Sequence, residues 1–306
     1  MKLIKPSFEI WNQPAGLEGV YKQIERVGRV CYKSEDKITE DSAKPFVDRM
    51  IKSGHGAMLE HGTVYLFCPT EEYVDSNGDV QYYNPLEKYQ DNNYSALADS
   101  NEGMYVTTNL RVLVENGWLG DLQYICEPTE FHEKRITVHF VCDRGVSHEF
   151  VRHRAMSFAQ ESTRYCNYSK DKFGNELTFI IPEWCPEIRE DSNKGWDPCS
   201  MYDKLYLQHL QSAEDTYFAL LKQWDERVPD KRYKSGFKNN PWMPQQARAV
   251  LPNSLKTELV VTGFVSDWNH FFDLRARGTT GAPHPQAKEL AEPLMKEFIA
   301  RKYINN

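Results

Sequence analysis

A segment of alternating apolar and polar residues that leads directly into a charged cluster constrains the fold of this chain most. The apolar positions of the alternation are Ile136, Val138, Phe140 and Cys142. This period of two predicts a half-buried strand over 136–143. Arg144-Gly145-Val146 predicts a turn, and Ser147 is a suitable N-cap for a short helix that ends near Arg154. A strand and a helix that lead into a polar loop, here ending near Arg164, commonly present a site from a rigid scaffold.

The charged cluster, residues 152–165, holds three arginines, a histidine, several hydroxyl groups and a carboxylate. Glu149 and Arg152 can share a helix face, whereas Arg152 and Arg154 would lie about 200° apart around a helix. The cluster could therefore contact two ligands on opposite sides. Arginine suits phosphates because its planar guanidinium donates hydrogen bonds in pairs. A solvated helix end with surface ion pairs explains the same composition equally well.

Composition narrows the class of protein. The chain has 306 residues, of which 40% are hydrophobic and 26% charged, so it is globular and long enough for one large domain or two ordinary ones. A net charge of −7 argues against a general nucleic-acid binder. Seven cysteines without a Cys-x-x-Cys pair indicate reduced thiols in a cytoplasmic protein and no zinc site. No apolar run is long enough to span a membrane.

Hydrophobic periodicity predicts the other elements. The expected strands are 1–12, 63–68 and 177–181. The expected helices are 17–31, one capped by Asp41 or Ser42 and stopped by Gly54, 201–224, one from Pro244 that carries Arg248, 255–275 and 284–303. Residues 69–135 are interpreted as an elaboration that carries no chemistry of its own. In it we expect a turn at 75–79 between strands, a polar loop over 84–101 and a helix from about 106 to 116.

Three features outside the cluster suggest chemistry, each with a simpler explanation. His55 and His61 could bind a metal, but a histidine at a helix end beside a carboxylate is more often a hydrogen-bonding residue, so we expect no metal. His148 and His153 are five positions apart and diverge by about 140° on a helix, which excludes the His-Glu-x-x-His zinc-protease motif. Cys166 is either a nucleophile or a small packed thiol.

Several motifs occur together at fixed spacing. Arg152-His153-Arg154 is followed by seven residues and Ser162, Gly54-His55 by Glu60-His61, and Leu274-Arg275 by His284-Pro285-Gln286, while 247–252 has the sequence Ala-Arg-Ala-Val-Leu-Pro. The first resembles the Arg-His-Arg-x7-Ser signature of the flavin-dependent thymidylate synthases, and the others are similar to further elements of that family. The resemblance covers most of the chain except roughly 69–135 and parts of 170–240. No Gly-x-Gly-x-x-Gly or Walker loop is present, so a dinucleotide would not be held in the Rossmann manner.

The resemblance implies an α+β fold with helices flanking an antiparallel or mixed sheet. The whole chain, 1–306, would be a single domain with an insertion at about 69–135. The implied reaction is the reductive methylation of dUMP to dTMP, with methylenetetrahydrofolate as carbon donor, NADPH as reductant and FAD as cofactor. The implied assembly is a homotetramer with active sites shared between subunits, and neither nucleic acid nor a membrane is an expected partner.

The family's roles transfer to matching positions in this sequence. Arg275 resembles the catalytic arginine held at the uracil. The positions that the resemblance assigns to dUMP are Glu149, Arg152, Gln160, Glu161, Ser162, Arg164, Arg248 and Arg275. The positions that it assigns to FAD are His55, Arg152, His153, Arg154, Gln160, Ser266 and His270. Ala159 and Gln160 stand where the family more often has Asn and Glu, and Glu149 stands where Gln is expected.

A second hypothesis is a non-catalytic protein that binds nucleotides or RNA. It draws on the mixture of basic and aromatic residues over 144–169 and on the abundance of tyrosine and tryptophan. The acidity of the whole chain and the long match to an enzyme signature weigh against it. A purified flavoprotein is yellow and an RNA-binding protein is not, so colour separates the two.

Overall fold

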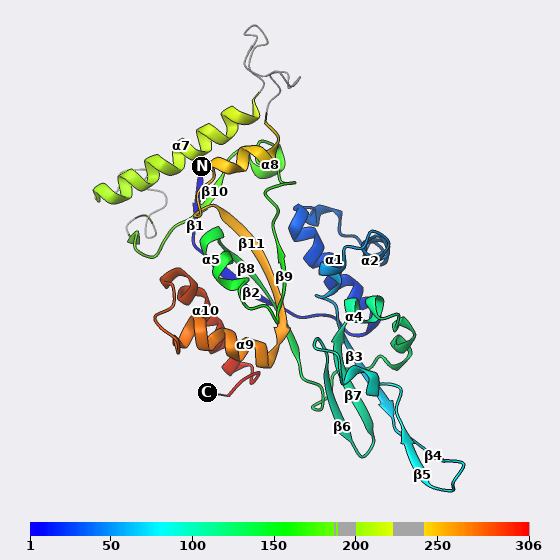
Figure 1. Cartoon of the computed structure of the whole chain (residues 1–306). Helices are drawn as coiled ribbons and strands as arrows, with labels where there is room; N and C mark the ends of the chain where they lie inside the picture. The colour runs from blue at the N-terminus through cyan, green and yellow to red at the C-terminus, as the bar shows by residue number, and fades with distance from the viewer. Residues whose placement is uncertain (187, 189–199, 223–241, 306) are drawn as a thin grey trace, which may run out of the picture.

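A four-stranded antiparallel sheet in the order β2-β8-β11-β9 forms the centre of the molecule (Figure 1). The computed structural model describes residues 1–186, 188, 200–222 and 242–305. The strands of the central sheet are β2 (Ser7–Trp11), β8 (Arg135–Asp143), β9 (Ser157–Gln160) and β11 (Lys256–Phe264). The predicted strand over 136–143 is therefore confirmed as β8, which pairs with both β2 and β11.

The two faces of the central sheet are covered by different helices. One face packs against α5 (Arg144–Phe150), α9 (Val265–Phe272) and α10 (Pro285–Ala300). The apolar residues predicted to share a face of β8 all lie in this core, as do the inward residues predicted for α10, Leu290, Leu294 and Phe298. On the other face Val260 and Ala159 pack against Val27 and Val30 of α1 (Gly16–Tyr32). Alternation along each strand thus supplies both cores.

The segment assigned to an elaboration forms a second sheet. Its order is β3-β7-β6, with β3 at Thr63–Pro69, β6 at Ala96–Ser100 and β7 at Gly103–Asn109. β3 pairs only with β7 among the described strands, so this strand belongs to the inserted unit and not to the central sheet. The exposed hairpin of β4 (Glu71–Val74) and β5 (Val80–Tyr83) projects beyond it, as the turn at 75–79 predicts (Figure 1).

Two predictions within this unit were wrong. The expected loop over 84–101 contains the 3₁₀ turn η2 (Glu87–Tyr89) as well as β6. The helix expected from 106 begins only after β7, as α4 (Leu110–Glu115), and Asn109 accepts a hydrogen bond from the N–H of Val112 as its N-cap. The run Val106-Thr107-Thr108 is β-branched, which favours a strand over a helix. A further 3₁₀ turn, η3, spans Leu119–Tyr124.

The N-terminal elements are as predicted, except that one expected strand is split in two. The expected strand over 1–12 is split into β1 (Lys2–Ile4) and β2 at Lys5-Pro6, because proline cannot donate to a strand ladder. β1 pairs in parallel with β10 (Thr178–Ile180), so the chain combines antiparallel and parallel pairs and the α+β class is confirmed. The helices α1 and α2 (Ala43–Lys52) are as predicted, and α3 (Gly56–Leu59) follows them. Two further short elements of the chain are the 3₁₀ turns η1 (Glu35–Lys37) and η4 (Asp171–Phe173).

The helix predicted over 255–275 was wrong in its first half. Residues 256–264 form β11, and only then follow α9 and the π-helical turn η6 (Asp273–Arg277). The alternation of a strand is seen here, since Leu259 lies in the core beside α9 and Val260 in the core beside α1. A short apolar run cannot be assigned by periodicity alone.

The helix after β8 also differs from the prediction. Asp143, and not Ser147, is the N-cap of α5, because its Oδ1 accepts from the N–H of Val146 at 2.7 Å. The helix ends at Phe150, so Arg152 and Arg154 lie in turns beyond it. The helix therefore both starts and ends earlier than predicted.

The remaining helices lie near the N-terminus of the chain (Figure 1). They are α7 (Met201–Leu221), α8 (Pro244–Ala247) and the 3₁₀ turn η5 (Arg248–Val250). The end of the helix predicted over 201–224 and most of the segments 183–199 and 229–243 lie outside the described residues. None of the helices in the described ranges has the length and apolar character that crossing a membrane requires.

Candidate active site

Arg275 on η6 is clamped by two residues from α5 and the turn after it. Its Nη1 donates to Glu149 Oε2 at 2.7 Å, its Nη2 to the carbonyl of Glu149 at 2.7 Å, and its Nε to His153 Nε2 at 3.2 Å. The Arg275 side chain is 13% exposed and that of Glu149 is 26% exposed. Charge-assisted hydrogen bonds of this geometry fix the plane of the guanidinium. The remaining exposed edge of Arg275 is therefore presented in one orientation.

His153 is held neutral in this arrangement. Burial lowers its pKa, and the charge of Arg275 and the neighbouring His270 lower it further, to about 4. Because Nε2 accepts the Arg275 hydrogen bond, the ring proton resides on Nδ1. The His153 ring lies 5.8 Å from that of His270 and 5.0 Å from that of Phe271, centroid to centroid. His153 thus acts as a fixed acceptor for Arg275.

The two arginines that flank His153 face different surroundings. Arg152 is 69% exposed and lies 3.4 Å from Glu149, which confirms the predicted pairing of these two residues. Arg154 lines a cavity of about 270 Å³ together with Arg111 and Arg135. Arg111 comes from the inserted unit and pairs with Glu60, so the insertion forms part of this cavity wall. The turn after α5, and not a continued helix, separates the two arginines.

A second cavity, of about 350 Å³, lies beside α5, between that helix and residues 248–255. Its polar side chains are Arg144, His148, Thr163, Arg248 and Asn253. Arg248 donates from Nη1 to Thr163 Oγ1 at 3.3 Å. Arg164, which follows Thr163 in the sequence, donates from Nε to Gln245 Oε1 at 3.2 Å. The segments that carry Arg164 and Arg248 are therefore adjacent, although the side chain of Arg164 points to α8.

The segment 160–162 lies at the end of β9. Gln160 donates to Ser147 Oγ at 2.8 Å and to Thr257 Oγ1 at 3.2 Å. Ser162 donates its backbone N–H to Cys31 O at 3.0 Å, and its hydroxyl oxygen accepts from the N–H of Arg164 at 3.2 Å. These contacts fix the backbone beside the second cavity.

Glu161 is buried and both of its oxygens already have protein partners. Lys256 Nζ lies 2.8 Å from Oε2, and the hydroxyl of Tyr168 donates to Oε1 at 2.9 Å. Lys256 also lies 2.6 Å from Glu258, which accepts in turn from Lys33. This ion network was not predicted, because Lys256 and Glu258 lie in a segment expected to be helical. A strand with charged residues at alternate positions was the signal that could have revealed it.

The comparisons with known proteins bear on these residues together. The model of a family described as thymidylate synthase complementing protein matches residues 127–301. A flavin-dependent thymidylate synthase from Corynebacterium aurimucosum is 30% identical over 288 residues, which cover 94% of this chain and 78% of that relative. The chain belongs to the flavin-dependent thymidylate synthase family.

Other similarities are shorter or weaker. A flavin-dependent thymidylate synthase from Corynebacterium efficiens is 32% identical over 133 residues, so the match spans 44% of this chain and 46% of that relative. A crystal structure of the UMP/dUMP methylase PolB from Streptomyces cacaoi with bound 5-Br UMP is 15% identical. It covers 98% of this chain and 92% of its own, with a TM-score of 0.42. At that score the superposition supports no conclusion about this chain.

Two of the positions assigned from the flavin-dependent thymidylate synthase family stand apart from Arg275. His55 is exposed at the N-terminal end of α3, which packs against α1 and α2. Ser266 opens α9, and Glu133 of the inserted unit accepts hydrogen bonds from its N–H and its hydroxyl. Within the described residues, no hydrogen bond, ion pair or ring contact joins either residue to the Arg275 cluster.

His61 is a buried hydrogen-bonding residue, which is the simpler of the two explanations given for it. Its Nδ1 lies 2.8 Å from Thr262 Oγ1, and burial together with the charge of Arg135 lowers its pKa to about 3. The described ranges contain no group of three His, Cys, Asp or Glu side chains that could hold a metal ion.

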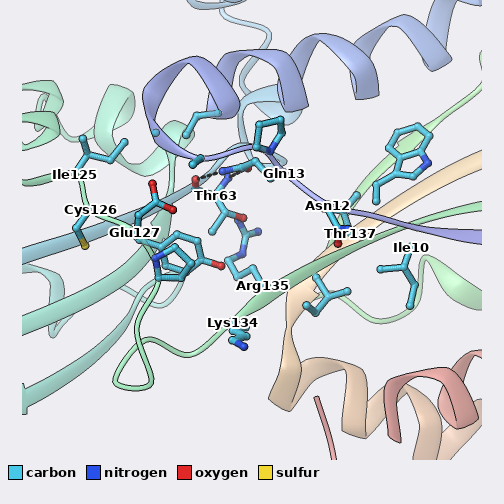
Figure 2. Close-up of a pocket in the computed structure, with 18 of the residues that line it drawn as sticks. Ile10, Asn12, Gln13, Thr63, Ile125, Cys126, Glu127, Lys134, Arg135 and Thr137 are labelled. Carbon is cyan, nitrogen blue, oxygen red and sulfur yellow. Dashed lines mark hydrogen bonds between the residues drawn. The ribbon is translucent and has the colours of Figure 1, made fainter. Parts of the chain in front are cut away.

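A third cavity, of about 350 Å³, contains none of the residues assigned from the family (Figure 2). It lies between the turn before α1, residues 125–128 of the inserted unit, and the start of β8. Gln13 and Thr63 exchange two hydrogen bonds of 2.8 Å on its wall, as Figure 2 shows. Arg135 lines this cavity as well as the one beside Arg154.

Proposed function

We propose that this chain catalyses the reductive methylation of dUMP to dTMP, with methylenetetrahydrofolate as carbon donor and NADPH as reductant. The observation that carries the proposal is the clamp on Arg275. A cation fixed at one orientation beside a neutral histidine suits a ring on which negative charge develops. Membership of the flavin-dependent thymidylate synthase family supports the same reaction.

Arg275 would lie at the uracil ring. Carbon 5 of uracil is a weak nucleophile, and a cation near the N3 and O4 edge stabilises the negative charge that spreads into the ring as C5 reacts. A guanidinium remains protonated throughout the physiological range, so it supplies charge without taking part in proton transfer. Glu149 and His153 keep its position fixed, which avoids reorganisation during the reaction.

The rest of dUMP would extend toward the second cavity. Arg164 and Arg248 would bind the phosphate, while Glu149, Arg152 and the segment 160–162 would line the nucleoside. Support comes from the exposure of Arg152 and from the fixed backbone at Ser162. Because both oxygens of Glu161 are occupied by Lys256 and Tyr168, Glu161 would position this segment instead of bonding to the nucleotide itself.

FAD would be held near the Arg152-His153-Arg154 turn. Side chains cannot supply hydride, so a bound flavin would provide that chemistry. The fit to a group with a diphosphate rests on Arg154 and Arg135, which line one cavity, and on the Nε of Arg135, which is buried without a partner in the described part of the chain. Arg111 lines the same cavity but is paired with Glu60 and Glu115. Gln160, Ser266, His270 and His55 complete the proposed set.

The site would be shared between subunits of a homotetramer. Arg152 and His270 are exposed on the single chain, so a neighbouring subunit is needed to enclose a bound flavin. We place the protein in the cytoplasm, since Cys31, Cys68, Cys126, Cys142 and Cys166 form no disulfide.

The direct test combines the purified, flavin-loaded protein with dUMP, methylenetetrahydrofolate and NADPH and measures dTMP. Replacing Arg275 by Ala should lower the rate roughly 100-fold or more. Arg277→Ala, a matched control on the same turn whose partner is Asp273, should retain turnover. Absence of dTMP from the flavin-loaded wild type, or equal rates for Arg275→Ala and wild type, would contradict the proposal.

A further inference from the structure

We propose that Arg144 is a third arginine at the nucleotide phosphate, beyond the pair Arg164 and Arg248. The inference rests on the proposed function, because it identifies which end of dUMP occupies the second cavity. Arg144 lines that cavity together with His148, Thr163 and Arg248. Neither the motif spacing nor the family resemblance assigns it a role.

One nitrogen of the Arg144 guanidinium is a buried donor without a partner in the described part of the chain. The backbone N–H of Arg144 is fixed by the carbonyls of Asn253 at 2.8 Å and Leu255 at 3.2 Å. Its Nη1 is buried, yet it has no hydrogen-bond partner within the described residues. Leaving a buried donor unpaired costs free energy, and more so when the group is charged. A ligand with acceptor oxygens would remove that cost.

No carboxylate of the described residues forms an ion pair with Arg144. The neighbouring Asp143 uses Oδ1 to accept from the N–H of Val146 at 2.7 Å and Oδ2 to accept from Gln286 at 2.7 Å. None of the described residues that line the cavity is acidic. A cavity that gathers Arg144, Arg248 and His148, in a chain with a net charge of −7, therefore favours an anion.

The geometry of α5 directs these groups to one side. Arg144 and His148 are four positions apart, so they share a helix face, whereas Glu149 is rotated about 100° further toward Arg275. Thr163, whose hydroxyl accepts from Arg248, is flanked by Ser162 and Arg164. The cavity volume of about 350 Å³ lies within the range of small-molecule sites, which leaves room for part of the nucleoside beside a phosphate.

A phosphate could reach this cavity from dUMP or from NADPH, which carries a 2′-phosphate. The chemistry that Arg144 recognises is the same in both cases, a dianionic monoester with acceptor oxygens. Contact with the segment 160–164 favours dUMP. Paired ligands with and without the phosphate separate the two sources, namely dUMP against 2′-deoxyuridine and NADPH against NADH.

The experiment measures these ligands on the flavin-loaded, assembled enzyme and on its Arg144→Gln variant. Dissociation constants for dUMP and 2′-deoxyuridine come from calorimetry, and KM values for NADPH and NADH from turnover. We expect dUMP to bind Arg144→Gln about tenfold or more weakly, whereas 2′-deoxyuridine is unaffected. Arg144→Lys should recover part of the dUMP affinity. The ratio of the KM values for NADPH and NADH should not change.

Thermal stability separates ligand binding from a structural role. Because Nη1 of Arg144 has no partner in the described part of the chain, Arg144→Gln without nucleotide should have a Tm no lower than wild type. Arg301→Gln removes the same charge from a surface pair with Glu297 and serves as the matched control for both measurements. Its dUMP affinity should equal that of wild type.

Four results would overturn the inference. The first is dUMP affinity in Arg144→Gln within about twofold of wild type. The second is an equal loss for dUMP and 2′-deoxyuridine with a lowered Tm, which would indicate a structural residue. The third is a loss confined to NADPH, and the fourth is no dUMP binding by the wild type at all. If the wild type binds dUMP through Arg144 and forms no dTMP, the proposed function fails and the assignment of Arg144 stands.

Discussion

At the scale of single residues, the burial of His153 and its contact with Arg275 make the stability of the fold depend on pH. The pKa of His153 falls from an ordinary 6.5 to about 4 in the folded chain. Between these two values the unfolded chain binds a proton that the folded chain does not. The free energy of unfolding therefore falls as the pH drops from about 6.5 toward 4, and the loss is complete below the lower value.

Replacing Arg275 by Gln should raise the pKa of His153, because it removes a positive charge and weakens the hydrogen bond to Nε2. The rise should be partial, since burial is the largest cause of the depression. Titration of the labelled His153 ring by NMR measures it. Arg277→Gln, two positions away and paired with Asp273, should leave the titration where it was. An unchanged pKa in a folded Arg275→Gln protein would show that burial acts alone.

The thiol of Cys166 offers a second residue-scale prediction. Burial raises its pKa, and nearby Glu161 raises it further, to about 12, so the thiol is protonated at neutral pH. Only the thiolate is an effective nucleophile. Cys166→Ala should keep most of its dTMP turnover and lose about 1 kcal/mol of stability from the small cavity. Abolished turnover in a folded variant, with a nucleotide adduct on Cys166 in the wild type by mass spectrometry, would support the nucleophile instead.

At the scale of elements, β11 places the charged side chains of Lys256 and Glu258 in the interior of the protein. Lys256 lies 2.8 Å from Glu161 and 2.6 Å from Glu258. Burial alone would raise the pKa of Glu258, but the hydrogen bond from His139 and the charges of Lys256 and Lys33 outweigh it and hold the pKa well below its usual range. The stability from this depression is present above the ordinary pKa of 4.5 and is lost as the pH falls through the folded value.

Lys256→Met should destabilise the chain by about 3–5 kcal/mol, because it leaves the buried carboxylate of Glu161 without its cation, whereas Glu258 keeps Lys33. Urea unfolding at neutral pH measures the loss. Lys288→Met, which removes a lysine from an exposed pair on α10, should cost within about 1 kcal/mol. Adding Glu161→Gln to Lys256→Met should restore part of the stability. Equal costs for Lys256→Met and Lys288→Met would refute the buried network.

At the scale of the whole molecule, α5 separates the two ends of the proposed nucleotide site. Arg248 lies at the cavity on one side of this helix, and Arg275 binds Glu149 on another. If one nucleotide touches both arginines across a subunit boundary, two defective chains can complement each other.

Arg248→Ala and Arg275→Ala proteins should each be nearly inactive, and mixed oligomers assembled from both should recover part of the dTMP activity. Sites that draw one arginine from each subunit would then be intact in a fraction of the assemblies. Light scattering verifies that mixing gives oligomers of the wild-type size, and each variant refolded alone is the control. Mixed oligomers that form but stay inactive would place both arginines of a site on one chain.

The sequence by itself determined the elements whose signal is local. The alternation of β8, the periods of α1 and α10, and the turn of the β4–β5 hairpin are contained in a few consecutive residues, and each was predicted correctly. The motifs also named Arg275, Glu149 and His153, although not that the first would bond to the other two from 126 and 122 positions away.

Only the tertiary structure decided which residues compensate one another. β11 is a strand because β8 and β9 pair with it on both sides, which outweighs a local period that a helix also satisfies. Glu161 is a buried partner of Lys256, 95 positions away. Nη1 of Arg144 has no partner in the described part of the chain, and the neighbouring Asp143 accepts a hydrogen bond from Gln286 instead. Burial and charge compensation depend on segments distant in sequence, so no local pattern encodes them.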